Sequence, residues 1–264
     1  MPKTIEKPVE PKRRQRAKAS VPVPPLPRIK LLEGDGEPLE SDWHVVQIHL
    51  LDELVRQLFQ GRTDFFCGGN MFIYYSLRQA RSVKRGRPLY KGPDFFVAKD
   101  VDGTKPRKYW AVWDEDGRYP DVIVELLSPT TAEKDKVENL QLYERVFRTG
   151  EYFWYDVETR ELAGFRLREG RYVPIEPNEQ GWLWSQELGA WLGVWEGVYQ
   201  GRRYPWLRLY TAEGTLVPTQ AEAERQRAEQ ALQQVEAERQ RAEAERQRAE
   251  RLAQRLRELG YEPE

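Results

Sequence analysis

The sequence contains few of the residues on which several large protein classes depend. One cysteine, Cys67, among 264 residues excludes a disulfide framework and a thiolate metal cluster. Two histidines, His44 and His49, are too few for a histidine-based zinc site. No apolar run approaches the ~18 residues of a membrane span, and the basic N-terminus lacks the apolar core of a secretory signal. We therefore expect a cytoplasmic protein with no membrane partner, in which carboxylates hold any metal.

Net charge is also nearly absent, because 42 Lys and Arg residues face 43 Asp and Glu residues. The charges are unevenly distributed along the chain. Residues 1–30 hold nine basic and two acidic residues together with seven of the 18 prolines, so we expect a disordered basic tail. This tail is either a solubilising segment or an arm that contacts nucleic acid. All nine tryptophans fall within 31–217, which we interpret as the globular domain.

A long polar helix is predicted after this domain. Residues 219–259 contain no Gly, Pro or aromatic residue, and the Ala, Glu, Gln and Arg that dominate them are good helix formers. We assign 218–259 to a helical tail and 260–264 to a flexible end. Heptad spacing places Val235 and Leu256 on one seam and Leu252 on the other, which favours self-association as a coiled coil. A solvated single helix held by Glu–Arg pairs is the alternative.

The pattern inside the domain predicts a layered α/β (α+β) fold. Apolar residues recur at helical spacing over 43–59. Among the short β-rich runs that follow, Val122 to Leu127 is apolar on both faces apart from Glu125. Such a strand is central in a sheet that helices cover. A second helix over about 131–148 and further strands follow it, so we expect a central mixed sheet flanked by helices.

Two segments near the end of the domain are predicted to be extended. The runs 162–167 and 172–175 flank Glu169 and Gly170, which indicates a β-hairpin. Residues 181–197 are apolar and rich in tryptophan, and we expect them to cover the sheet. Their tryptophans suit either an aromatic core, which we favour, or a platform for stacked bases.

Two carboxylates stand out because each lies in an apolar strand. Asp94 follows Pro93 at the start of one run, and Glu125 lies in the middle of another. A buried, unpaired carboxylate is costly, so it is neutralised, paired or bound to a metal. If the two strands are neighbours, Asp94 and Glu125 form an oxygen-rich site that suits Mg²⁺ or Mn²⁺. We then expect removal of either side chain to leave metal-free stability unchanged or raised, because a repulsive pair is relieved.

These residues carry a resemblance to a known family. Pro93-Asp94, the string PDVIVELLSPT that contains Glu125, then Asp135, Tyr143 and EYFWYD at 151–156 resemble the Uma-two type family of restriction endonucleases, within the PD-(D/E)xK superfamily. The resemblance covers about residues 40–200. It implies a restriction-endonuclease-like fold, an endonuclease acting on DNA, and Asp94 and Glu125 as ligands of Mg²⁺ or Mn²⁺.

The catalytic lysine of this superfamily has no direct counterpart in the chain. Where the superfamily has a lysine two residues after the strand glutamate, this sequence has Leu127. Where the Uma-two family often has one, four residues after the helix aspartate, this sequence has Asn139. Lys136 precedes Asn139 by one helical turn, so its ammonium could reach the same place. Lys136 is therefore a third candidate catalytic residue, or else an ordinary surface charge.

A basic stretch at 78–91 precedes Asp94. It carries six basic residues and no acid, and its position could place it beside the metal site as a surface that contacts phosphates. A solvated loop without a partner is the alternative. The six candidate nucleic-acid-binding residues are Arg78, Arg81, Lys84, Arg85, Arg87 and Lys91.

Two interpretations of the function remain open. The first is a hydrolase, a Mg²⁺-dependent endonuclease that cleaves the phosphodiester bonds of DNA. The second is a catalytically degenerate nuclease fold that binds nucleic acid or assembles proteins through its coiled coil. Asp94 and Glu125 favour the first interpretation, whereas Asn139 in place of lysine favours the second.

Overall fold

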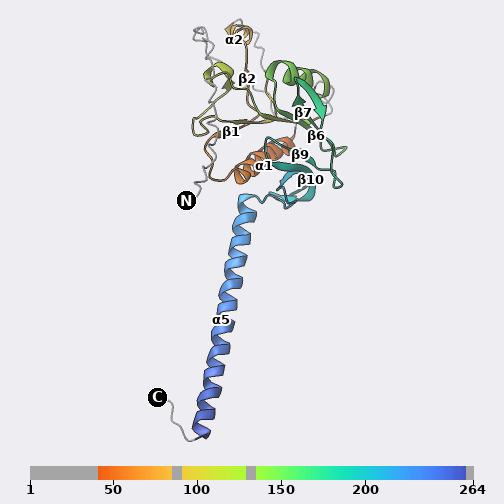
Figure 1. Cartoon of the computed structure of the whole chain (residues 1–264). Coiled ribbons are helices and arrows are strands. Elements are labelled where there is room, and N and C mark those ends of the chain that lie inside the picture. Colours follow the sequence, from red (N-terminus) through yellow and green to blue (C-terminus); the bar gives the residue numbers. More distant parts are fainter. Residues whose placement is uncertain (1–40, 85–90, 129–134, 260–264) are drawn as a thin grey trace, which may run out of the picture.

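Stacked helices and sheets make up the globular part of the chain, and a long helix extends from it (Figure 1). The computed structural model describes residues 41–84, 91–128 and 135–259, so the predicted tails 1–30 and 260–264 lie outside the described residues. The elements in chain order are α1 (Asp42–Leu58), β1 (Phe65–Gly69), β2 (Ile73–Tyr74), α2 (Leu77–Lys84), β3 (Phe95–Lys99), β4 (Trp110–Ala111), η1 (Val112–Asp114), β5 (Val122–Leu127), η2 (Asp135–Asn139), α4 (Leu140–Leu142), η3 (Tyr143–Phe147), β6 (Glu151–Asp156), β7 (Glu161–Arg168), β8 (Arg171–Pro174), β9 (Leu183–Ser185), β10 (Ala190–Tyr199), β11 (Arg202–Tyr210) and α5 (Gln220–Glu258).

A mixed sheet is the central layer. In the described part of the chain it has six strands in the order β1-β3-β5-β6-β7-β8. β5 and β6 run parallel, and the other neighbours are antiparallel. Every residue of β5 is buried, because the strand has neighbours on both sides and other elements cover both faces. The predictions of a central strand at 122–127 and of a mixed sheet flanked by helices are confirmed.

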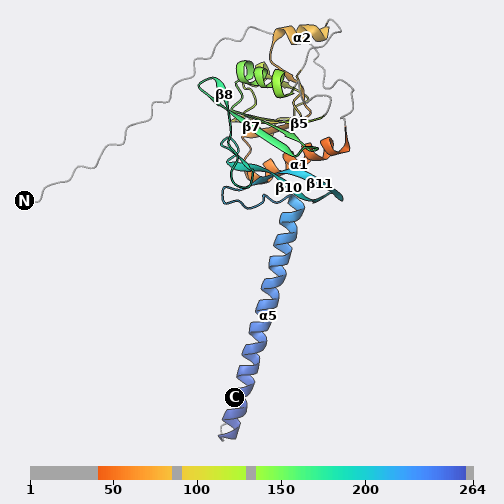
Figure 2. The ribbon, with the colours of Figure 1, turned by 90° about the vertical axis from the view of Figure 1, so that its right-hand side faces the viewer.

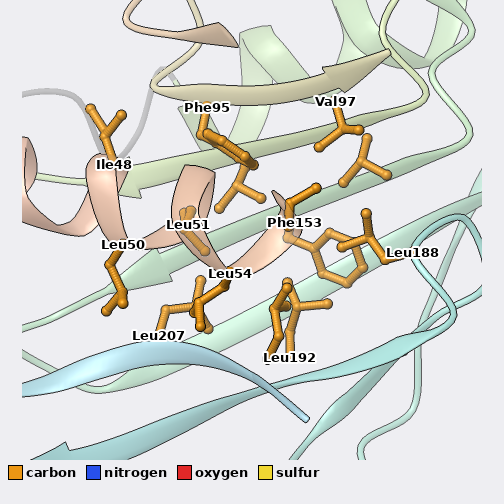
Figure 3. Close-up of a cluster of buried hydrophobic side chains, with 14 of the residues drawn as sticks. Ile48, Leu50, Leu51, Leu54, Phe95, Val97, Phe153, Leu188, Leu192 and Leu207 are labelled. Atoms are coloured by element: carbon orange, nitrogen blue, oxygen red, sulfur yellow. The ribbon is translucent and has the colours of Figure 1, made fainter. Parts of the chain in front are cut away.

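The helix α1 lies between the mixed sheet and a second, antiparallel sheet of β9, β10 and β11 (Figure 2). Leu51 and Leu54 of α1 share a core with Phe95 and Phe153 of the mixed sheet and with Leu207 of β11 (Figure 3). Removal of these side chains from water supplies the main stabilisation of this layer. The predicted helix at 43–59 is therefore confirmed, and the core explains its apolar face.

A buried glutamine joins α1 to the second sheet. The Gln47 side-chain amide donates to the Leu207 carbonyl at 3.0 Å, and its oxygen accepts the Leu207 N–H at 2.9 Å. Because β11 is an edge strand of its sheet, these two backbone groups lack a strand partner on that side. Gln47 takes the place of such a partner, which avoids two buried and unsatisfied polar groups.

The opposite face of the mixed sheet is covered by the crossover between β5 and β6. The helical turns η2, α4 and η3 lie on this side, away from α1 (Figures 1 and 2). Alternate residues of β5 therefore meet different partners: Val122, Val124 and Leu126 pack towards α1, whereas Ile123 and Leu127 pack towards the crossover. The first residues of the helix expected at 131–148 lie outside the described residues.

The two predicted extended segments form strands. The hairpin of β7 and β8 turns at Glu169 and Gly170, which both have positive φ, as the tight turn requires. The tryptophan-rich segment forms β9 and most of β10. Trp182 stacks on Tyr210 with ring centroids 3.8 Å apart, and Leu183 belongs to the main core. The four tryptophans of the segment are only partly buried, so the choice between an aromatic core and a stacking platform is not decided by these contacts.

The 39-residue helix α5 extends away from the globular part and buries none of its residues (Figure 1). Its first turn is nevertheless bound to the globular part. Arg208 of β11 is 0 % exposed and pairs with Glu222 of α5 at 2.7 Å. Burial is the largest influence on Glu222 and opposes its ionisation, but the hydrogen bonds from Arg208 and Thr219 and the charge of Arg208 together outweigh it and lower the pKa of this carboxyl. None of the helices described is both long and apolar enough to cross a membrane.

The Arg208–Glu222 pair predicts where the chain can be shortened. Removal of 218–264 leaves Arg208 buried without its carboxylate, so we expect a loss of about 2–3 kcal/mol in the free energy of unfolding. Removal of 227–264 keeps the pair and should leave stability unchanged. Urea denaturation measures both.

In the full chain, Glu222→Gln should be destabilised, and Glu224→Gln, an exposed neighbour, should not. Equal stability of the two truncated chains would show that Glu222 is dispensable.

Candidate metal and phosphate site

Asp94 and Glu125 lie opposite each other on neighbouring strands. β3 and β5 are paired with Phe95 opposite Val124, and one further step in this register places Asp94 opposite Glu125. Two backbone amides fix the carboxylates: the Asp94 N–H donates to Glu125 Oε2 at 3.0 Å, and the Leu126 N–H donates to Asp94 Oδ2 at 2.7 Å. The strands are therefore neighbours, as the sequence argument required, and the two carboxylates are held together.

Glu125 is only 2 % exposed, and hydrogen bonds reach both of its oxygens. Besides the Asp94 N–H on Oε2, three side chains donate to Oε1: the Tyr143 hydroxyl at 2.7 Å, the Asn139 amide at 3.2 Å and the Lys91 ammonium at 3.1 Å. These donors come from the crossover helix and from the segment before β3. Hydrogen bonds and an opposite charge offset the cost of burying this carboxylate.

This arrangement corrects the expectation that removing Glu125 leaves stability unchanged or raised. That expectation treated the two carboxylates as a repulsive pair with no counter-charge. Lys91, whose side chain is 14 % exposed, supplies the counter-charge, and Asn139 and Tyr143 supply two further donors. Loss of the Glu125 side chain would leave these groups buried without their acceptor.

Asn139 and Tyr143 act from one face of the crossover helix. They are four residues apart, so their side chains project side by side, and both are buried. The sequence argument treated Asn139 only as a missing lysine and Tyr143 only as part of the family resemblance. Their spacing was the available signal, because two polar side chains at i and i+4 on an apolar helix face indicate a shared buried acceptor.

Lys136 lies over β6, the strand next to β5. Its ammonium pairs with Glu161 of β7 at 3.2 Å and lies 4.1 Å from the ring centroid of Trp154. Trp154 is the β6 residue opposite Glu125, so Lys136 lies on the site's face of the sheet, and its ion pair is with Glu161. A catalytic role for Lys136 stays a prediction.

The structure separates the members of the basic stretch 78–91. Arg78 and Arg81 are exposed on α2, which lies on the side of the sheet that carries the crossover helix (Figures 1 and 2). Lys84 is the last residue of α2, and Arg85 and Arg87 lie outside the described residues. Lys91 is brought to Glu125. Contact of these six residues with nucleic acid stays a prediction.

The oxygen donors of the site suit a hard divalent cation. Within the described ranges, no three His, Cys, Asp or Glu residues are grouped so that they could share a metal. Mg²⁺ does not require three, because it keeps several waters and binds through one or two carboxylates together with substrate phosphates. Asp94 is partly exposed and Glu125 is its immediate neighbour. The pair therefore fits Mg²⁺ or Mn²⁺ in ligand type and number.

Comparison with known families identifies the family of the chain. The Uma2 family, described as "Putative restriction endonuclease", has a model that matches residues 18–199. The match spans more than half of the chain, and the protein belongs to this family. None of the curated proteins matches the sequence significantly.

One solved structure to which the chain is similar is described as a putative nuclease belonging to DUF820 from Anabaena variabilis ATCC 29413. The two share 10 % sequence identity with a TM-score of 0.40, over 57 % of this chain and 76 % of that chain. This likeness is too slight to bear on function.

The contacts of Glu125 predict its effect on stability. Glu125→Ala should lower the free energy of unfolding by about 3–5 kcal/mol, because it breaks a buried ion pair and removes the acceptor of three hydrogen bonds. Glu125→Gln keeps an acceptor and should cost less. Urea denaturation without divalent metal measures both. Glu161→Ala, which removes the exposed partner of Lys136, is the control and should change stability by less than about 1 kcal/mol. A Glu125→Ala variant as stable as the wild type would contradict the assignment.

Proposed function

We propose that this protein is a metal-dependent endonuclease that hydrolyses phosphodiester bonds of DNA, with Asp94 and Glu125 as the ligands of Mg²⁺ or Mn²⁺. The observation that carries the proposal is the pairing of these two carboxylates across β3 and β5, in a chain whose family is described as restriction endonucleases. A site that only stabilises the fold has no need of two carboxylates at one place, since each costs free energy to bury.

The residues around the carboxylates would hold them in a fixed geometry. The Leu126 N–H orients Asp94, and the Asp94 N–H orients Glu125, so each carboxylate is positioned by the backbone of the other's strand. Tyr143 and Asn139 fix Glu125 from the crossover helix. A bound Mg²⁺ would supply the activation of water and the neutralisation of charge on the phosphoryl group.

Two exposed arginines would contribute to binding rather than to chemistry. Arg78 and Arg81 project from α2 on the side of the sheet that carries the site. Contacts of arginine with phosphate oxygens orient a nucleic acid without reading its sequence, and they weaken as salt rises. We therefore assign to α2 a role in holding the DNA backbone near Asp94.

The proposal predicts that isosteric neutralisation of either carboxylate abolishes activity. Asp94→Asn and Glu125→Gln should each weaken Mn²⁺ binding at least about tenfold and plasmid nicking about 100-fold or more, since a metal contributes several kcal/mol to such a reaction. Calorimetric titration of Mn²⁺ and a supercoiled-plasmid nicking assay measure these effects. Asp121→Asn is a matched control, because Asp121 also accepts a backbone amide, from Lys99 at 2.7 Å, but lies before the start of β5.

Two other results would redirect the proposal. If both variants bind Mn²⁺ and nick DNA as the wild type does, Asp94 and Glu125 are not the site. If the wild type binds Mn²⁺ and DNA but does not cut, the chain is a catalytically degenerate nuclease fold that binds nucleic acid. In that case its DNA affinity should still fall steeply with salt.

We also propose a second copy of this chain as the partner of α5. Five of its apolar side chains are 43–71 % exposed in the single chain: Leu232, Val235, Leu252, Leu256 and Leu259. Pairing of two helices along the predicted heptad seams would bury four of them, Val235, Leu252, Leu256 and Leu259, because Leu232 lies beside the seams. The opposing observation is the set of ion pairs within the helix, such as Arg225 with Glu229 and Arg246 with Glu250, which stabilise a single helix in water.

Self-association is tested by sedimentation at protein concentrations of about tens of micromolar, because a seam this rich in Ala and Glu should pair weakly. The full chain should sediment as an oligomer, and the chain ending at Gln226 as a monomer. Leu252→Gln with Leu256→Gln should shift the full chain towards the monomer. The control is Gln240→Ala with Gln247→Ala, which alters positions outside both seams. A monomeric full chain would support the single-helix interpretation.

A further inference from the structure

The ammonium group of Lys91 occupies the candidate site. It lies 3.1 Å from Glu125 Oε1, and its side chain is 14 % exposed. It also lies 5.5 Å from the ring centroid of Tyr143, whose hydroxyl donates to the same carboxylate oxygen. A cation over an aromatic ring and beside a carboxylate is attracted by both, and these two contacts hold the ammonium in this position.

The backbone fixes the segment that carries Lys91. The Ile73 N–H of β2 donates to the Lys91 carbonyl at 2.6 Å, and the Asn70 N–H donates to the Asp94 carbonyl at 2.8 Å. The four residues 91–94 are therefore anchored at both ends to the segment 70–73. Lys91 and Asp94 enter the site from one short, anchored stretch of chain, and the contacts with Glu125 and Tyr143 then place the ammonium.

Lys91 reaches the same oxygen as Asn139. The amide nitrogen of Asn139 lies 3.2 Å from Glu125 Oε1, almost the same separation as for Lys91. Neither Asn139 nor Leu127, the two positions at which the sequence analysis sought a lysine, carries a charge. The positive charge at this oxygen comes from a residue before β3 instead of from β5 or the crossover helix.

We propose that Lys91 is the catalytic cation of this site and that it contacts the scissile phosphate of the DNA. This inference rests on the proposed endonuclease function and names the residue that stabilises its transition state. Water adds its oxygen to phosphorus, one P–O ester bond breaks, and the leaving oxygen receives a proton that derives from the water. Lys91 keeps its own proton throughout and offsets the negative charge that develops on the phosphoryl oxygens.

The test compares variants that remove the charge of Lys91 and return it from the helix. Lys91→Met should lower plasmid nicking by about 10²–10³-fold, the usual effect of losing one such electrostatic group. Its Mn²⁺ affinity, measured by calorimetry, should be equal to that of the wild type or tighter, because an ammonium no longer competes for Glu125. Lys91→Met with Asn139→Lys should recover at least about tenfold in nicking, because both side chains reach Glu125 Oε1.

Two controls accompany these variants. Lys99→Met removes another partly buried lysine, one that pairs with Glu187 away from the site, and it should nick as the wild type does. Lys91→Gln keeps a hydrogen-bond donor for Glu125 without the charge. If Lys91→Met does not fold, Lys91→Gln takes its place in every comparison, and thermal denaturation establishes which variants are folded.

The outcomes separate this inference from the proposed function. A wild type that binds Mn²⁺ but cuts no DNA overturns the endonuclease function and Lys91's role with it. A wild type that cuts, beside a Lys91→Met variant that cuts equally well, overturns the role of Lys91 alone. Joint loss of nicking and Mn²⁺ binding that Asn139→Lys does not rescue would make Lys91 a residue that only positions Glu125, which also overturns the inference.

Discussion

The burial of Glu125 in the central strand is the constraint on which the site depends. β5 is buried along its whole length, so a carboxylate there must receive hydrogen bonds and a counter-charge from other elements. The backbone before β3 supplies one donor, the crossover helix supplies Asn139 and Tyr143, and the segment anchored to β2 supplies Lys91. Each of these elements is thereby tied to β5, and the same bonds that stabilise the fold orient the carboxylate.

A second buried glutamate shows what a purely structural carboxylate looks like in this fold. Glu151 of β6 is 1 % exposed and accepts hydrogen bonds from Arg166 on β7, from the Ser185 hydroxyl and from the Gln186 N–H. These donors join three elements, and the acidic residue among its described hydrogen-bond partners, Glu187, donates its backbone N–H while its carboxylate pairs with Lys99. Glu125 differs in two respects that matter for chemistry: Asp94 stands opposite it, and Asp94 is partly exposed to solvent. Burial alone therefore does not distinguish Glu125 from Glu151, whereas the partly exposed carboxylate of Asp94 beside Glu125 does.

Local sequence patterns predicted several elements correctly, because recognising these elements does not require knowledge of what they pack against. The apolar run of β5, the amphipathic face of α1, the Glu169-Gly170 turn and the Ala-, Glu- and Arg-rich helix α5 each carry their signal within a few residues. The contacts that join elements carry no such signal. The Lys91–Glu125 pair depends on a backbone bridge from Lys91 to Ile73, and Arg208 finds Glu222 only because β11 leads into α5. The sequence thus predicted that two carboxylates lie together. It did not predict that Lys91 supplies their counter-charge.

The position of a charge matters for its electrostatic effect, and the element that carries it does not. A lysine on β5, on the crossover helix or before β3 can place an ammonium beside the same carboxylate oxygen, and the field at a phosphate bound there would be similar. The three positions differ in how the surrounding chain must hold the lysine in place. Lys91 lies three residues from Asp94 on a stretch anchored at both ends, so one segment of chain carries a carboxylate and a cation together. Asn139 can then remain uncharged and serve as a hydrogen-bond donor, because a second ammonium at Glu125 Oε1 would add repulsion between like charges.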